Sequence, residues 1–152
     1  MANTAGVATR FKRDLLKGLH AFGSSVVRGA TTADSYKMAL FLVTASRGPS
    51  DVSYSATGEV SGTGYSAGGA AVTNATEPDT SGTTAFWTPS ASISWTTFTS
   101  SGAFDTAQLY NDTSASDLVV ANFALGSQSI TAGTFTLTMP TNDASTGLIR
   151  IA

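Results

Sequence analysis

The sequence predicts a mainly β protein, a β-sandwich or jelly roll with one short N-terminal amphipathic helix. Only one segment has the apolar spacing of a helix, whereas strand-like segments recur through the rest of the chain with turn residues between them. The chain has 20 Ser and 24 Thr among 152 residues, and only 12% of its residues are charged. This composition excludes a long charged coiled coil and a charge-rich disordered chain.

The length suits one ordinary domain. We expect residues 1–30 to form an N-terminal arm that carries the helix, and residues 31–152 to form a single β-sandwich domain that includes a glycine-rich loop at residues 47–82. No apolar stretch approaches the roughly 20 residues that cross a bilayer, and the first residues lack the apolar run of a secretory signal. We therefore expect neither membrane insertion nor Sec-type export.

The predicted helix covers residues 10–23. Its apolar side chains recur at intervals of four, four and three residues, which places them on one side: Phe11, Leu15, Leu19 and Phe22. Thr9 is the expected N-cap, and Gly23 stands where a left-handed residue ends many helices. Gly18 weakens the helix. A helix of this length is marginal alone in water, so its apolar side must lie against the domain or a neighbouring subunit.

The first expected strand covers residues 35–44 and is apolar on both alternations, which indicates burial on both faces; a buried helix segment is the alternative. Residues 47–82 are rich in Gly, Ser, Thr and Ala. Tyr54, Val60, Tyr65 and Val72 are spaced like the anchors of a long ordered loop or of two short edge strands, and we favour the loop.

Further strands are expected after this loop. Residues 80–89 form a strand closed by proline, and the next strand places Ile93, Trp95 and Thr97 on one face. Residues 103–112, 117–126 and 147–152 supply three more. Residues 133–140 give the clearest one-sided strand, in which Phe135, Leu137 and Met139 alternate with threonines. The total is six to eight strands, and parallel βαβ folding is improbable because no helices alternate with them.

The sequence lacks the residues that most kinds of catalytic site require. The absence of cysteine excludes disulfides, thiolate zinc sites and cysteine nucleophiles. The single histidine, His20, lies in the predicted helix, so a two-histidine zinc site is excluded and we interpret His20 as a helix-surface or interface residue. Residues 62–67, GTGYSA, match the relaxed dinucleotide-binding pattern, but no convincing helix follows them. We predict no catalytic residues, no cofactor and no metal.

Two further groups of residues have a functional and a structural interpretation. Trp87 and Trp95 suit a β core, or alternatively an exposed platform that stacks on sugars. The acidic residues mostly lie in predicted turns, where aspartate bonds its own backbone. A pair of them could bind calcium or serve a glycosidase, although the sequence does not fix the distance between any two: Glu77, Asp79, Asp105, Asp112, Asp117 and Asp143.

The charge is divided along the chain. Residues 1–50 have a formal net charge of +5 and residues 51–152 one of −7. Several basic groups on one short helix are typical of a solvated face or of a contact with an acidic protein, so we do not expect nucleic-acid binding.

Four segments, in this order along the chain, are similar to segments of a known protein family: FKRDLLKGLHAFG, SYKMALFLVT, YSATGEVSGTGYSAGGAAVT and TFTLTMPTNDASTGLIRIA. With them the chain resembles a family of small virion structural proteins of tailed bacteriophages. The most distinctive pieces are residues 58–69, GEVSGTGYSAGG, and the terminal LIRIA. The resemblance implies a non-enzymatic head decoration or cement protein of β-sandwich type, displayed as oligomers on the major capsid protein lattice at the outer surface of the virion.

We expect the apolar side of the helix and residues 58–69 to bury surface between subunits, while basic groups face acids on the partner. The expected partners are the major capsid protein and further copies of the chain, with a trimer natural at three-fold lattice positions. The candidate partner-binding residues are Arg10, Phe11, Arg13, Leu15, Lys17, Leu19, Phe22 and Tyr65.

Three alternatives stay open. The first is that the chain is a tail or fibre component of the virion, and the second is that it is a carbohydrate-binding β-sandwich module. The third, ranked last, is an enzyme that acts through paired acids. The carbohydrate-binding module requires Trp87 or Trp95 at the surface, and the enzyme requires two carboxylates close together in a cleft.

Overall fold

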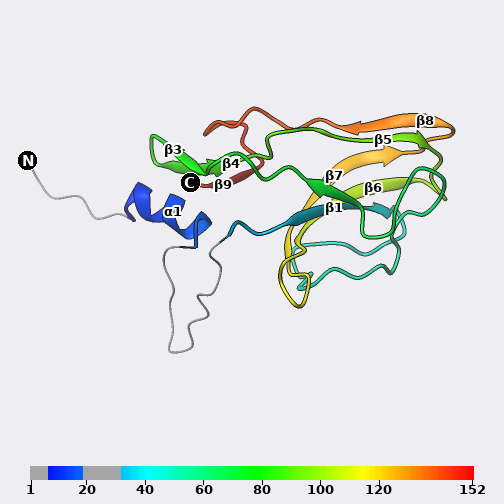
Figure 1. Ribbon diagram of the computed structural model, residues 1–152, viewed down its shortest axis with the longest axis horizontal. Helices are drawn as coiled ribbons and strands as arrows, with labels where there is room; N and C mark the ends of the chain where they lie inside the picture. Colours follow the sequence, from blue (N-terminus) through cyan, green and yellow to red (C-terminus); the bar gives the residue numbers. More distant parts are fainter. Residues whose placement is uncertain (1–6, 19–31) are drawn as a thin grey trace, which may run out of the picture. The chain divides into compact units, whose positions relative to one another are not determined.

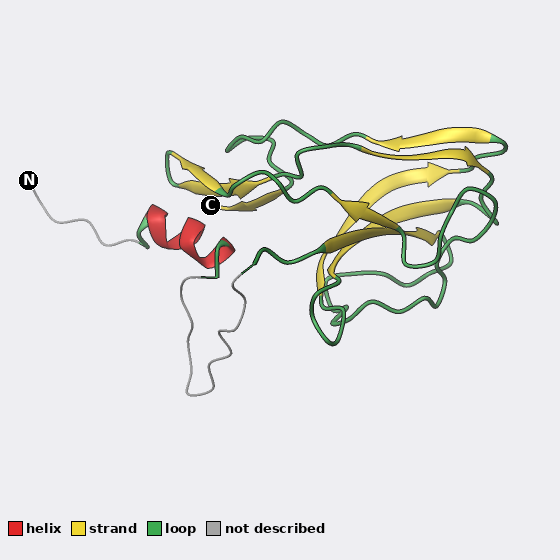
Figure 2. Ribbon diagram, in the orientation of Figure 1, coloured by secondary structure: helices red, strands yellow, loops and turns green. Residues whose placement is uncertain are grey.

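The computed structural model describes residues 7–18 and 32–152. These residues form one helix and nine strands, and every strand pair is antiparallel (Figures 1 and 2). The prediction of a mainly β protein is therefore confirmed. Within the described part of the chain, no helix is long and apolar enough to span a membrane.

The described chain divides into two compact units. Unit 1 takes in the N-terminal helix together with residues 75–90 and 139–152, and unit 2 takes in residues 32–74 and 91–138. Unit 1 therefore includes two segments of the range that is expected to form one β domain.

Unit 1 consists of a short helix and a three-stranded sheet. The helix α1 spans Thr9–Leu16 and contacts β3 (Asp79–Ser81) and β4 (Thr84–Trp87), while β9 (Ile149–Ile151) pairs with the other edge of β4. The single strand expected at residues 80–89 is therefore wrong, because β3 and β4 form a hairpin. Gly82 has φ 58° in the two-residue loop between them, at the position where type II′ turns place glycine.

The helix α1 ends earlier than its sequence pattern predicts. Lys17 is its C-cap, and Gly18 follows with φ 67°, the left-handed conformation that closes many helices. Gly18 thus ends the helix, and the role expected of Gly23 falls outside the described residues. The expected N-cap is also wrong, because Ala8 occupies that position and makes no side-chain hydrogen bond there.

The main sheet of unit 2 has four strands in the order β2 (Ala70–Val72), β1 (Tyr36–Leu42), β6 (Phe104–Asn111) and β7 (Val119–Gln128). The predicted burial of β1 on both faces is confirmed, because four consecutive residues, 38–41, have no exposed surface. Alternate residues of a strand point to opposite faces, so Met38 and Leu40 pack on one side of the sheet and Ala39 and Phe41 on the other.

The second sheet of unit 2 is the pair formed by β5 (Ile93–Phe98) and β8 (Gly133–Leu137). Ile93 and Trp95 are buried as expected, but Thr97 is exposed with φ 52° because the register shifts between Trp95 and Phe98. This irregularity turns Phe98 inward in place of Thr97. In β8 the half-buried Phe135 and Leu137 alternate with exposed threonines, which confirms the one-sided pattern within this strand.

Aromatic side chains connect this pair to the main sheet. The Phe104 ring of β6 lies 5.9 Å from the Phe98 ring and 5.1 Å from the Phe135 ring, centroid to centroid. The Tyr65 ring lies 6.1 Å from that of Trp95. Edge-to-face and offset arrangements at such distances are favourable beyond the burial of apolar area. One face of the main sheet is therefore covered by the β5–β8 pair.

Candidate docking surface

The other face of the main sheet is covered by a long loop that follows β1. A polar group on this face, which we call the amide cluster, consists of Asp51, Gln108 and Asn122. Asp51 Oδ2 accepts hydrogen bonds from Gln108 Nε2 at 3.1 Å, Asn122 Nδ2 at 3.0 Å and the backbone N–H of Gly48 at 3.1 Å. Gln108 Nε2 also donates to Asn122 Oδ1 at 3.0 Å. A carboxylate with three donors anchors the loop to β6 and β7.

The amide cluster was not visible to sequence reasoning. Gln108 and Asn122 lie within the strands expected at residues 103–112 and 117–126, and the strand pattern gives neither side chain a role. The sequence does hold one signal, because Gln108 is a polar residue between the apolar Ala107 and Leu109. In the structure all three residues have no exposed surface. A buried amide needs partners within the fold, because leaving it unpaired is unfavourable. Gln108 Nε2 has two acceptors, whereas no hydrogen bond to its Oε1 is formed among the described residues.

Arg47 fixes the next part of the same loop, around Ser55 and Thr57. Its guanidinium carbon lies 4.1 Å from the centroid of the Phe41 ring, a cation–π contact with the middle of the sheet. Nη2 of Arg47 donates to the carbonyl oxygens of Ser55 and Thr57. This basic residue therefore holds its own loop in place.

A second network, the tyrosine cluster, consists of Tyr54, Glu59, Tyr65 and Tyr110. Glu59 accepts hydrogen bonds from the Tyr54 hydroxyl at 2.5 Å and the Tyr65 hydroxyl at 2.7 Å, and from the Gly68 N–H at 2.9 Å. The Tyr110 hydroxyl donates to the Gly68 carbonyl at 2.7 Å, and its ring stacks on Tyr54 with centroids 4.5 Å apart. The cluster ties the loop to the sheet.

Burial raises the pKa of each phenol in the tyrosine cluster. The pKa of Tyr65 and that of Tyr54 lie well above the ordinary value because of burial, with the Glu59 carboxylate adding to the effect. Burial and then the nearby Asp112 and Asp117 carboxylates raise the pKa of Tyr110 to about 12. The phenols therefore keep their protons and act as hydrogen-bond donors rather than as bases.

The glycines of residues 58–69 allow the loop to touch the sheets directly. A Cβ on Gly62 would lie 2.0 Å from the Thr99 carbonyl oxygen, and one on Gly69 would lie 2.0 Å from that of Met38. Both residues have positive φ, 129° and 78°. These two glycines thus supply positive backbone angles and allow close approach of the loop to its own chain, and the expected contact of residues 58–69 with another subunit stays a prediction.

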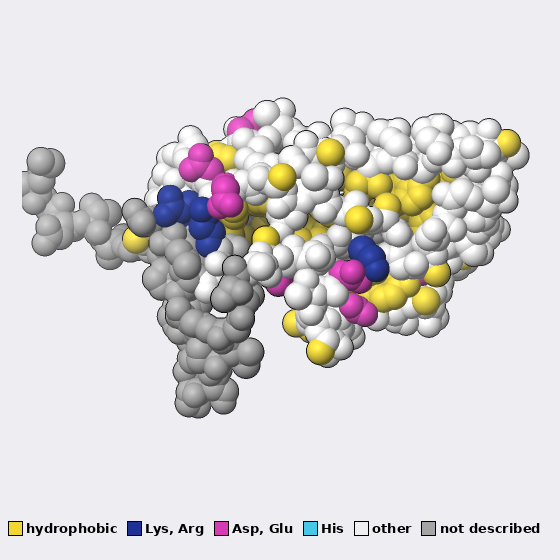
Figure 3. Space-filling view, viewed as in Figure 1, with side chains coloured by type: hydrophobic (Ala, Val, Ile, Leu, Met, Phe, Trp, Pro, Cys, Tyr) yellow, Lys and Arg dark blue, Asp and Glu magenta, His cyan; other side chains and the backbone are white. Residues whose placement is uncertain are grey.

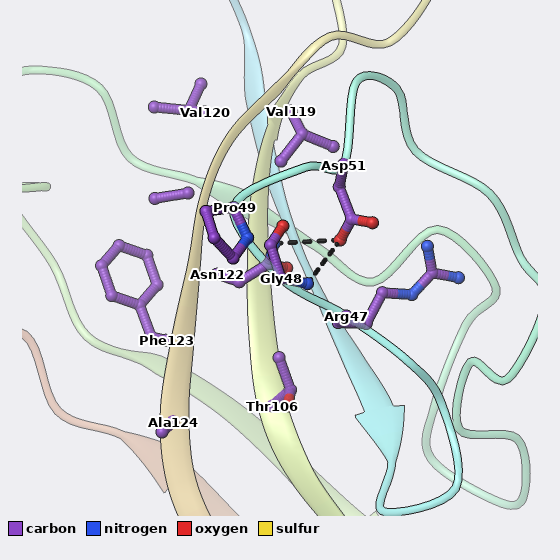
Figure 4. A pocket seen from close by; sticks show the side chains of 11 residues that line it. Arg47, Gly48, Pro49, Asp51, Thr106, Val119, Val120, Asn122, Phe123 and Ala124 are labelled. Atoms are coloured by element: carbon purple, nitrogen blue, oxygen red, sulfur yellow. Dashed lines mark hydrogen bonds between the residues drawn. The ribbon is translucent and has the colours of Figure 1, made fainter.

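An open hollow of about 510 Å³ lies along β7 in unit 2 (Figure 4). Figure 4 shows Asn122 and Asp51 on the side of β7 that faces the loop, while Val120 and Phe123 lie on its other side. The hollow is lined by Arg47, Gly48, Pro49, Asp51, Thr106 and residues 119–124.

Exposed apolar side chains gather at the start of β7. Val52 is 72% exposed, Leu118 46% and Val120 45%. Their segments adjoin, because Ser53 forms a β-bridge with Leu118 and the Val119 N–H donates to the Val52 carbonyl. We call these three residues the β7 rim. Large apolar side chains exposed together are typical of contact surfaces.

The helix residues expected to bind a partner lie in or beyond α1. Leu15 is 36% exposed, and Lys17 Nζ lies 2.6 Å from Glu77 Oε2 of the same unit. Figure 3 shows basic and acidic side chains side by side over α1. Arg10, Phe11 and Arg13 belong to α1 as well, whereas Leu19 and Phe22 lie outside the described residues.

Tyr65 has its contacts within unit 2. Its hydroxyl accepts a hydrogen bond from the Leu40 N–H at 2.8 Å, and its half-buried ring packs on Trp95 and Phe98. The structure thus brings Tyr65 together with Glu59. Its expected role toward a partner stays a prediction, as does that of the helix residues.

The two tryptophans are core residues. Trp87 is 8% exposed and Trp95 5%, so neither offers its ring to a sugar. Several predicted turn acids bond locally; Asp143 Oδ1, for example, accepts from the Ser145 and Thr146 N–H groups. Hydrogen bonds from Thr146 and Ser145 lower the pKa of Asp143. Among the residues with described positions, no three His, Cys, Asp or Glu side chains are placed to hold a metal ion.

No protein-family model matches the chain, and neither the curated proteins nor the solved structures contain a match to it.

Proposed function

We propose that the protein is a bacteriophage capsid decoration protein that binds the major capsid protein lattice and stabilises the head. The proposal rests on the sequence resemblance and on the way the loops of unit 2 are held. Its fold, in this proposal, is a β-sandwich made by the main sheet and the β5–β8 pair, which pack through Phe98, Phe104 and Phe135.

The observation that carries the proposal is the internal use of polar groups beside the candidate surface. Asp51 and Glu59 each accept three hydrogen bonds from their own chain. The bonds to Asp51 fix the loop after β1 to β6 and β7, and the bonds to Glu59 join parts of this loop to one another. Groups bonded in this way give a rigid outer surface. A rigid surface suits docking, because little conformational freedom is lost when the partner binds.

In this function several weak contacts act together. An oligomer, in the simplest case a trimer at a three-fold position of the lattice, engages several capsid subunits at once and so gains effective concentration. The exposed Leu15 of α1 is the residue through which the helix is proposed to reach the capsid. The same design serves a tail or fibre position, and the experiment below separates the two.

The test measures binding to heads. Expanded heads that lack the protein are mixed with the purified chain, sedimented and heated, and labelled chain is located by electron microscopy. We expect saturable binding and heads that resist higher temperatures. The Leu15→Lys variant should bind more weakly, whereas Val43→Lys, which changes a valine 45% exposed in unit 2, should bind normally. Label confined to the tail, or undecorated heads as heat-resistant as decorated ones, would exclude the role.

A further inference from the structure

We propose that the free edge of β7 pairs with the β7 edge of a second copy of this chain, joining two copies by an antiparallel strand contact about a two-fold axis. The argument begins with the order of the main sheet, in which β7 is the last strand. A short segment pairs with its beginning, through the bridge between Ser53 and Leu118. From Ala121 to Gln128, no other strand of the described residues pairs with the outer edge.

The regular part of this edge carries no charge and no proline. The register of β7 against β6 shifts at Val120 and between Ala124 and Gln128, and residues 121–124 pair regularly between these two places. Edge strands of monomeric β proteins are usually guarded by lysine, proline or inward-pointing charges. Residues 118–142 contain no charged residue, so β7 and the turn and strand that follow it are neutral throughout. The apolar residues of the β7 rim are exposed beside the edge, and residues 119–124 of β7 line the hollow together with Arg47, Gly48, Pro49 and Asp51 of the loop.

Rigidity makes the edge a ready template. Asn122 of β7 donates to Asp51 at 3.0 Å and to the Gly48 carbonyl at 2.8 Å, so the strand is held in place from the loop side. Figure 4 shows that Val120 and Phe123 lie on the opposite side of the strand from these bonds. The backbone of β7 is therefore fixed before any partner arrives.

The neutrality of the edge selects the occupant. A strand that brought a charge beside Val120 and Phe123 would bury it without a counter-ion, which is unfavourable. The regular segment of β7, residues 121–124, is itself neutral and identical in every copy. Antiparallel pairing centred on Phe123 places Asn122 opposite Ala124, so no like charges meet. The contact is isologous and therefore closed, and it is independent of any three-fold association in the particle.

The test uses two exposed alanines on opposite edges of the same sheet, Ala124 in β7 and Ala71 in β2. Sedimentation equilibrium without capsids is expected to show concentration-dependent pairing of the wild-type chain. Ala124→Lys should weaken this association at least about tenfold, because two lysines meet near the axis. Ala71→Lys should associate as the wild type does.

A second measurement does not depend on introducing charge. The chain has no cysteine, so Ala124→Cys and Ala71→Cys each carry one thiol. A short bifunctional thiol reagent should link Ala124→Cys into dimers and leave Ala71→Cys largely unlinked. A wild-type chain that stays monomeric at millimolar concentration, or equal association of the two lysine variants, would overturn the proposal. So would preferential linking through Ala71→Cys. Because no capsid is present, these results are independent of the decoration role.

Discussion

Replacing Gly69 with alanine tests whether close backbone packing is the reason for the glycine-rich loop. Gly69 has φ 78°, and a Cβ there would lie 2.0 Å from the Met38 carbonyl oxygen in the buried strand β1. The left-handed conformation costs alanine about 1–2 kcal/mol. Forcing the loop away from β1 adds about 1–3 kcal/mol of overpacking. We therefore expect Gly69→Ala to lower the free energy of unfolding by about 2–5 kcal/mol.

Two other glycines with positive φ separate these contributions. Gly126 has φ 67° and open space at the Cβ position, so Gly126→Ala should lose only about 1–2 kcal/mol. Gly68 has φ 87°, and a Cβ there would lie 3.2 Å from the Tyr110 hydroxyl, so Gly68→Ala should fall between the other two.

The assay is urea unfolding followed by tryptophan fluorescence and far-ultraviolet circular dichroism. The expected order of stability is Gly126→Ala, then Gly68→Ala, then Gly69→Ala. Equal losses for Gly69→Ala and Gly126→Ala would refute the reasoning, because only backbone conformation would then matter. If Gly69→Ala does not fold, the comparison of Gly68→Ala with Gly126→Ala decides the question.

Three further predictions concern the polar networks. The pKa of Tyr110 is raised from 10.0 to about 12. The protonated phenol therefore contributes fully to the free energy of unfolding below pH 10, and this contribution is lost as the pH rises toward 12. Tyrosinate absorbance of the native protein at pH 10 would contradict this. In urea unfolding, Asp51→Ala should lower the free energy of unfolding by about 1.5–3 kcal/mol, whereas Asp79→Ala, at an exposed position, should change it by about 0.5 kcal/mol or less. Equal effects of the two variants would show that the amide cluster does not stabilise the loop. Lys17→Ala should cost at most about 1 kcal/mol in thermal unfolding, because its partner Glu77 is 81% exposed, and a larger loss would show that this pair is more than a surface ion pair.

The sequence by itself determined those strands in which apolar residues follow a regular alternation. Alternation of apolar residues predicted β8, and an apolar run on both alternations predicted β1 with both faces buried. These predictions succeeded because a strand places alternate side chains on opposite faces whatever its neighbours are.

Helix length and strand register depended on particular backbone conformations. The apolar spacing continued to Phe22, yet α1 ends at Leu16 because Gly18 adopts φ 67°. The alternation in β5 pointed to Thr97, yet a register shift turns Phe98 inward. A residue in the left-handed conformation interrupts the regular backbone geometry, so a periodic pattern does not continue unchanged through it.

Tertiary structure alone decided the candidate surface. The amide cluster joins Asp51 to Gln108 and Asn122, which are 57 and 71 positions away in the chain. No local pattern encodes such a contact, since a turn aspartate and two strand amides each have an ordinary explanation alone. The free edge of β7 likewise exists only through the order of strands in the sheet. Local periodicity fixes which residues face inward, whereas the packing of distant segments fixes which polar groups meet and which edge stays open.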